Sequence, residues 1–215
     1  GPSESVQVMG LSGDPLRNFE IERLEISDAA GVWFDANDLT LTWRPFALLR
    51  RHVSIESVAA GSVAIARRPQ LEPTQSSDSS SSYRVTLGGF DLVDVALGES
   101  IIGQALTLDA QGQLHTQTDG TLEGVLDVER TDQPGDSVDV TFARSGTGTM
   151  SGEFQVDGAA DGPIATLVRA PMGEAVSAEG TLSGTEPEGQ GEAVLIFGEQ
   201  QAMTGELSWT AQDLE

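Results

Sequence analysis

Apolar residues recur at every second position through most of the chain. Phe19 and Ile21 alternate with acidic residues, and Leu24 and Ile26 resume the alternation after a slip of one residue. A period of two is typical of β-strands with one apolar face, and the slip predicts a bulge. Turn signals such as DAAG, DQPGD and EPEGQG separate the alternating runs,. The pattern therefore predicts an all-β protein of many short strands.

Two segments depart from this period and predict short helices. Pro45 opens the segment 45–50 and Pro163 opens the segment 163–170, each at the first helical turn, where proline is favoured. Helices of this length are not stable in isolation. We therefore expect both to cap the sheet through their apolar residues.

A five-residue repeat recurs in the second part of the chain. GTLEG (120–124), GTMSG (148–152) and GTLSG (180–184) share the pattern Gly-Thr-apolar-x-Gly. Recurrence at such a period is typical of stacked β architectures, so it favours an elongated open sheet. The alternation alone also fits a two-sheet sandwich or a closed barrel, and chance recurrence in a Gly- and Thr-rich chain is the other explanation of the repeat.

Composition divides the chain into four segments. Residues 1–3 are typical of an expression scar. We expect residues 4–69 to form an N-terminal β cap, residues 70–82 a serine-rich linker or loop, and residues 83–215 an acidic segment of repeated strands,. No apolar run approaches the ~20 residues that a membrane-spanning helix needs. Any anchor is therefore expected outside this sequence, in a longer chain of which it is a fragment.

The charge and the reactive side chains narrow the function. The formal net charge is -23, and residues 70–215 carry four arginines against 25 acidic residues; such a surface repels the phosphates of nucleic acid. The chain has no cysteine, which excludes disulfides and thiolate metal sites. His52 and His115 stand apart from any catalytic motif,. We therefore expect that the protein is not an enzyme and that it binds neither a metal ion nor a cofactor.

Basic and aromatic residues gather in one part of this acidic chain, around Trp33 and Trp43. The arginines there are candidates for contact with anionic lipid headgroups, because a cation near such a surface gains roughly 1 kcal/mol. In the alternative interpretation they form a solvated or salt-bridged rim of the cap. The candidates are Arg44, Arg50, Arg51, Arg67 and Arg68.

Four motifs in the same region occur in a fixed order: GLSG (10–13), ISDAAGVW (26–33), LTWRP (41–45) and VAIARRP (63–69). On these motifs, residues 8–69 resemble the N-terminal periplasmic part of the TamB (translocation and assembly module subunit) family of AsmA-like proteins. The resemblance implies a curved, U-shaped open sheet, known as a β-taco, with an apolar trough.

The resemblance also implies a cellular role in Gram-negative bacteria. Such a protein lies in the periplasm, is anchored to the inner membrane by an N-terminal helix missing here, and reaches a TamA-like outer-membrane protein through a C-terminal region also missing here. It carries glycerophospholipids between the inner and outer membranes. The alternative role is that of a scaffold or chaperone that assists outer-membrane β-barrel assembly and protein secretion by pairing with strands at open sheet edges.

A lipid trough needs a continuous apolar floor rather than a polar recognition site, since each buried methylene contributes roughly 0.8 kcal/mol. We expect apolar residues of successive strands to line this floor, although the same residues would also suit an ordinary core. The expected lining is Leu106, Leu108, Leu122, Leu126, Val138, Val140, Phe142, Phe154, Val156, Leu195, Phe197, Leu207 and Trp209.

Overall fold

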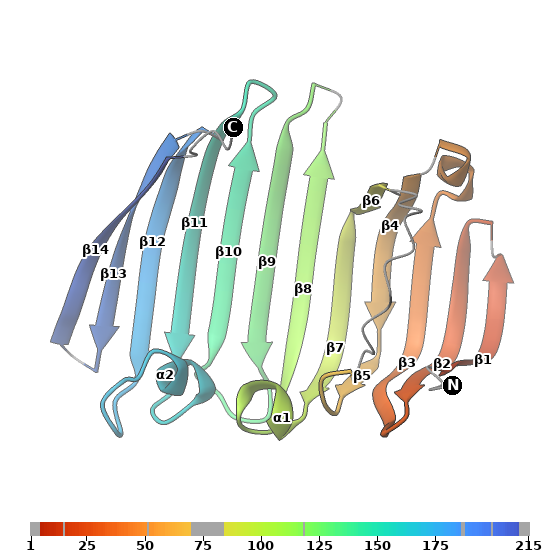
Figure 1. The fold of residues 1–215 in the computed structure, drawn as a ribbon, viewed down its shortest axis with the longest axis horizontal. Coiled ribbons are helices and arrows are strands. Elements are labelled where there is room, and N and C mark those ends of the chain that lie inside the picture. Colours follow the sequence, from red (N-terminus) through yellow and green to blue (C-terminus); the bar gives the residue numbers. More distant parts are fainter. Residues whose placement is uncertain are drawn as a thin grey trace. The chain divides into compact units, whose positions relative to one another are not determined.

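The computed structural model describes residues 5–14, 16–50, 52–69, 84–117, 119–185, 188–198 and 200–210. In these residues fourteen strands belong to one mixed sheet, in the order β1-β2-β3-β4-β7-β8-β9-β10-β11-β12-β13-β14, with β5 and β6 attached beside β3, β4 and β7 (Figure 1). The predicted all-β, open-sheet class is confirmed. The predicted serine-rich linker, residues 70–82, lies outside the described residues.

Two compact units divide the chain between Gln111 and Gly112. The elements of unit 1 are β1 (Ser5–Asp14), β2 (Asn18–Asp28), β3 (Gly31–Trp43), the 3-10 helix η1 (Pro45–Arg50), β4 (His52–Ala60), β5 (Ser62–Ile65), β6 (Arg84–Leu87), β7 (Gly89–Leu97) and α1 (Glu99–Ile102). The division falls inside β8 (Leu106–Thr116). The elements of unit 2 are β9 (Leu122–Arg130), β10 (Ser137–Arg144), β11 (Thr149–Gly158), α2 (Pro163–Leu167), β12 (Val176–Thr185), β13 (Glu188–Phe197) and β14 (Gln200–Thr210).

Unit 1 combines an antiparallel meander with a parallel crossover. Strands β1 to β4 pair antiparallel in chain order, whereas β4 pairs parallel with β6 and β7, and β5 pairs parallel with β7. A parallel pair requires a connection that returns the chain to the starting end of the sheet. The strands that precede and follow the predicted serine-rich segment therefore belong to the same unit.

The apolar alternation changes phase once in the strands of unit 1. Ala36 and Leu39 contact the same core although they are three residues apart, because Asp38 between them has a positive φ of 53°. In β7, Asp94 has a positive φ of 48° and lies at the corresponding change of phase. At the predicted bulge in β2 both ladders skip Glu22 and then resume in the same register, so the irregularity is present but adds no residue relative to β1 or β3; the register of β2 with β3 shifts between Ile26 and Ser27. The slip in the sequence reflects a phase change that neighbouring strands share.

Unit 2 is an antiparallel meander in which β9 to β14 each pair with the next strand in the chain. Helix α2 begins at Pro163, as predicted, but ends at Leu167 rather than at residue 170, because Arg169 has a left-handed φ of 57° that a helix does not accommodate,. The predicted helix at 45–50 is present as η1. Helix α1 has only four residues, too few for the sequence pattern to reveal.

Candidate functional site

The antiparallel register of unit 2 gathers apolar residues on one side of the sheet, since directly paired residues point to the same side. Val140, for example, is the partner of Leu126 in β9 and of Phe154 in β11. We call this side the apolar face of unit 2. The residues of the expected lining that share it are Leu122, Leu126, Val138, Val140, Phe142, Phe154, Val156, Leu195 and Phe197.

The remaining four residues of the expected lining are placed differently. Leu106 is buried, and Leu108 packs against the core cluster of unit 1. The register pairs Leu207 with Gly191 and Trp209 with Gly189, which puts both strand positions on the apolar face. Their side chains lie outside the described residues.

Glycines on the apolar face are covered by large side chains from neighbouring strands. A Cβ added to Gly124 would lie 2.1 Å from the ring of Phe142, and one added to Gly180 would lie 2.5 Å from the ring of Phe154. Each aromatic ring therefore lies over the bare backbone of the next strand. The glycines of a β-sheet commonly allow such a close approach.

The expected lining left out several apolar residues of this face, among them Met150 and Leu182. Met150 is the partner of Arg144 and Gly184, and Leu182 is the partner of Gly152 and Gly191. Both are the third residue of the five-residue repeat, as Leu122 is. Extending the lining to every copy of the repeat would have found them.

Replacing Gly180 with alanine is expected to destabilise the protein by roughly 1–3 kcal/mol, because the new methyl group overpacks the face. It would meet both the Phe154 ring and, at 2.7 Å, the backbone oxygen of Glu192. Urea denaturation measures the change. Gly205→Ala is the matched control, since a Cβ there meets nothing within 4 Å; equal losses for the two variants would contradict the proposed seating of Phe154.

The apolar face stands open in the part of the chain that the structure describes. The described strands all belong to one sheet, and unit 2 taken by itself contains no second sheet that could cover this face. Phe142 is 40% exposed and Leu182 37% exposed. Helix α2 lies at one end of the face, where a Cβ added to Gly158 would lie 2.6 Å from Val176 and 2.9 Å from Ile164. The face is therefore available to a ligand across the middle of β9 to β13.

The opposite side of unit 2 is acidic. Two hollows, of about 560 and 700 Å³, are lined mainly by residues of this side, although Phe142, Phe154 and Leu182 of the apolar face also contribute to their walls. Their acidic lining residues are Glu123, Asp139, Glu153, Glu179 and Glu192.

Carboxylates on the acidic side influence one another. The pKa of Asp139 is raised, first by a hydrogen bond with the carboxyl of Asp127, and further by burial and by repulsion from Asp157 and Glu129. Within the described ranges, no group of three or more His, Asp or Glu side chains is arranged to hold a metal ion.

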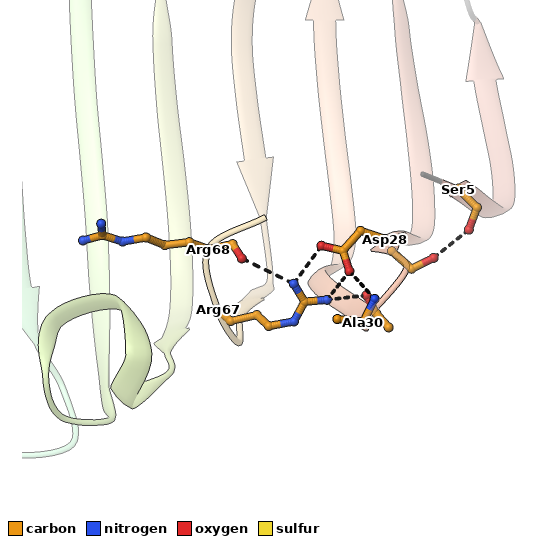
Figure 2. A network of polar contacts seen from close by, with 7 residues as sticks. Ser5, Asp28, Ala30, Arg67 and Arg68 are labelled. Atoms are coloured by element: carbon orange, nitrogen blue, oxygen red, sulfur yellow. Dashed lines mark hydrogen bonds and ion pairs between the residues drawn. The ribbon is translucent and has the colours of Figure 1, made fainter. Parts of the chain in front are cut away.

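Two of the arginines proposed for headgroup contact have acidic partners in unit 1. Arg67 donates to both carboxylate oxygens of the buried Asp28 and to the carbonyl oxygen of Gly31 (Figure 2). Arg44 pairs with Glu56 at the surface. These pairs favour the interpretation of a salt-bridged rim over that of free cations.

The structure gives less information about the other three arginines proposed for headgroup contact. Arg68 makes a long hydrogen bond, 3.4 Å, to the carbonyl oxygen of Ile101. The side chain of Arg50 and the whole of Arg51 lie outside the described residues. Of the three candidates whose side chains are described, Arg44 and Arg67 are paired with different carboxylates, so these three do not form one cationic site.

A buried ion pair holds one end of unit 2. Arg130 is 6% exposed and donates to Asp132 at 2.9 and 3.0 Å and to Asp136 at 3.0 Å. Asp136, itself 5% exposed, also accepts a hydrogen bond from the backbone N–H of Ala159. This network joins the β9–β10 turn to the loop before α2.

No family model, curated protein or solved structure matches the chain. Among the helices that the structure describes, none has the length and apolar character needed to cross a bilayer.

Proposed function

We propose that the apolar face of unit 2 carries the acyl chains of a glycerophospholipid. The observation behind this proposal is that β9 to β13 present apolar residues at successive cross-strand positions, and that the described part of unit 2 taken by itself contains no second sheet that could cover them. A contiguous apolar patch at a protein surface commonly marks a binding site.

Simple transfer energies support an acyl chain as the occupant. A 16-carbon chain that buries its methylenes on an apolar surface gains up to roughly 12 kcal/mol, at about 0.8 kcal/mol for each group. Contact with one open face buries only part of each methylene, so the actual gain is smaller. Because this attraction is non-directional, it holds a chain without fixing its position, which suits a carrier.

The charge of the opposite side of unit 2 also favours binding of the lipid on the apolar face. The acidic side of unit 2 carries Glu123, Glu153, Glu179 and Glu192, and it would repel a phosphate group. An anionic headgroup is therefore favoured beyond the apolar face rather than beneath the sheet.

The cellular setting is part of the proposal. On the strength of the sequence motifs in residues 8–69, we place the protein in the periplasm as part of a TamB-like bridge. The full-length chain would be anchored in the inner membrane and would contact a TamA-like partner at the outer membrane, with lipid moving along the sheet between them.

Native mass spectrometry of the purified chain tests the proposal. Dipalmitoyl phosphatidylglycerol is expected to form a one-to-one complex that persists in the gas phase. Glycerophosphoglycerol, the same headgroup without acyl chains, is expected to form none. Absence of the lipid complex, or equal binding of the headgroup alone, would overturn the assignment of the apolar face.

A further inference from the structure

Arg144 brings a positive charge to the apolar face of unit 2. It is the last residue of β10, and the alternation along this strand puts it on the same side of the sheet as Val140 and Phe142. Its direct partners, Leu122 in β9 and Met150 in β11, are apolar residues of this face. Arg144 is therefore a cation at one end of an apolar surface.

Within the described strands β9 to β14, the row of cross-strand partners that contains Arg144 holds no second charged residue. Each member of the row pairs directly with the next, so all their strand positions lie at the same end of the face. The row is Leu122, Arg144, Met150, Gly184, Gly189 and Trp209.

Two glycines of this row leave bare backbone at the end of the face. Gly184 and Gly189 are direct partners, and the three atoms nearest to a Cβ added to Gly184 belong to the backbone of Gly189 and Glu188. Gly180, deeper in the face, is instead covered by an aromatic ring. Because these two strand positions carry no side chain, the end of the face has room for a polar headgroup.

The opposite end of the face carries a cation that is already compensated. Since β9 and β10 are antiparallel, Arg130 at the end of β9 and Arg144 at the end of β10 lie at opposite ends. The buried Arg130 donates to Asp132 and Asp136. The third arginine of unit 2, Arg169, is exposed in the loop after α2. The two ends of the face therefore differ in charge.

The length of the face matches that of an acyl chain. Val138 lies six positions before Arg144 in β10, a distance of roughly 20 Å at about 3.4 Å per residue. The hydrocarbon core of a bilayer is ~30 Å thick, so a chain of one leaflet extends for about half of that thickness. A phospholipid with its phosphate at Arg144 has room for its chains on the rows of Phe142, Val140 and Val138.

We infer that Arg144 binds the phosphate of the lipid headgroup and makes the apolar face selective for phospholipids over uncharged lipids with the same chains. A guanidinium has five N–H donors and can give two of them to one phosphate, so others remain for contacts within the protein. The formal net charge of -23 repels an anionic headgroup, and Arg144 offsets this repulsion locally. The inference rests on the proposed binding of lipid by the same face.

Extraction of two labelled lipids from vesicles tests the inference. Phosphatidylcholine vesicles carry a trace of dipalmitoyl phosphatidylglycerol or of dipalmitoylglycerol, which has the same chains and no phosphate. The vesicles are incubated with the full chain and removed by centrifugation, and the labelled lipid that stays with the protein is counted. We expect both lipids to be retained, with phosphatidylglycerol favoured about tenfold, an effect typical of hydrogen bonds between charged groups.

Substitutions of Arg144 separate the role of its charge from a role in folding. Arg144→Gln and Arg144→Met are each expected to lower the ratio of retained phosphatidylglycerol to diacylglycerol about tenfold, because the diacylglycerol depends on the apolar rows alone. Arg144→Lys keeps the charge and should keep part of the preference. Arg169→Gln is the matched control, since it removes the same charge outside the face and should leave the ratio within twofold of the parent. A circular dichroism spectrum that matches the parent shows that each variant has folded.

The outcomes distinguish this inference from the proposed function. Retention of neither lipid by the parent would overturn both. Three results would overturn the headgroup site alone: equal retention of the two lipids by the parent, an unchanged ratio in a folded Arg144→Gln or Arg144→Met protein, and an equal change of the ratio in Arg169→Gln. Glycerophosphoglycerol, added in excess, should displace neither lipid; displacement of the phosphatidylglycerol would show that the site binds free phosphate esters instead.

Discussion

Replacing Leu126 with aspartate is expected to weaken phospholipid binding at least tenfold. Leu126 lies on the apolar face between neighbouring strands, opposite Val140, and a carboxylate there interrupts the surface on which an acyl chain rests. A tenfold change corresponds to about 1.4 kcal/mol, close to the contribution of two buried methylenes. The increase in fluorescence of an acyl-labelled NBD phosphatidylglycerol on titration with protein measures the affinity.

The adjacent residue provides the control. Val125 is the partner of Thr141, lines a hollow on the acidic side and is 52% exposed. Val125→Asp makes the same type of chemical change on the other side of one strand, and it should leave lipid affinity within twofold of the parent. Because Leu126→Asp itself could unfold the strand, Phe142→Ser serves as a second variant at a more exposed position. Unchanged affinity in folded Leu126→Asp and Phe142→Ser proteins would refute lipid binding on this face.

Replacing Arg130 with alanine is expected to reduce the free energy of unfolding by about 3–5 kcal/mol, because it leaves a buried carboxylate without its cation. Asp136 is 5% exposed and would keep only the backbone N–H of Ala159 among the hydrogen bonds described above. The pKa of the Arg130 guanidinium is raised, chiefly by its hydrogen bonds with Asp132, so the arginine is charged at any ordinary pH. Urea denaturation followed by circular dichroism measures the loss.

Arg44→Ala is the comparison for this prediction. Arg44 and Glu56 form an ion pair whose side chains are 71% and 42% exposed, and exposed pairs contribute about 0–1 kcal/mol. Similar destabilisation by the two substitutions would show that burial of the Arg130 network has no energetic consequence. Adding Asp136→Asn to Arg130→Ala should recover part of the loss, because the neutral amide carries no uncompensated charge.

The strand pattern could be predicted because residue type follows the side of the sheet so closely. Val138, Val140 and Phe142 share the apolar face, whereas Asp139 and Thr141 line hollows on the acidic side. An alternation of this kind identifies a strand and its two sides. It does not reveal which strands pair, and the crossover that brings β4 beside β7 left no local signal in the sequence.

Other parts of the site could not be predicted from the sequence, because they depend on contacts between residues that are distant in the chain. Arg67 seemed available for a headgroup, but Asp28, 39 residues earlier, occupies its guanidinium. Leu108 has the same alternation as the lining residues, yet it packs into the core of unit 1. The residue type alone does not distinguish a packed side chain from an available one, since burial is decided by neighbours that pattern analysis does not see.

The parallel pairing in unit 1 constrains the order in which the chain can fold. In unit 2 each hairpin can close as soon as its second strand has been synthesised, since every partner is adjacent in sequence. Strand β7 instead needs β4 and β5 to be held in place by β3 before its own ladder can form, and closing the intervening loop costs entropy before any contact is gained. Docking of β7 is therefore expected to limit the folding rate of unit 1, and the hairpins of unit 2 are expected to mature first in refolding from urea.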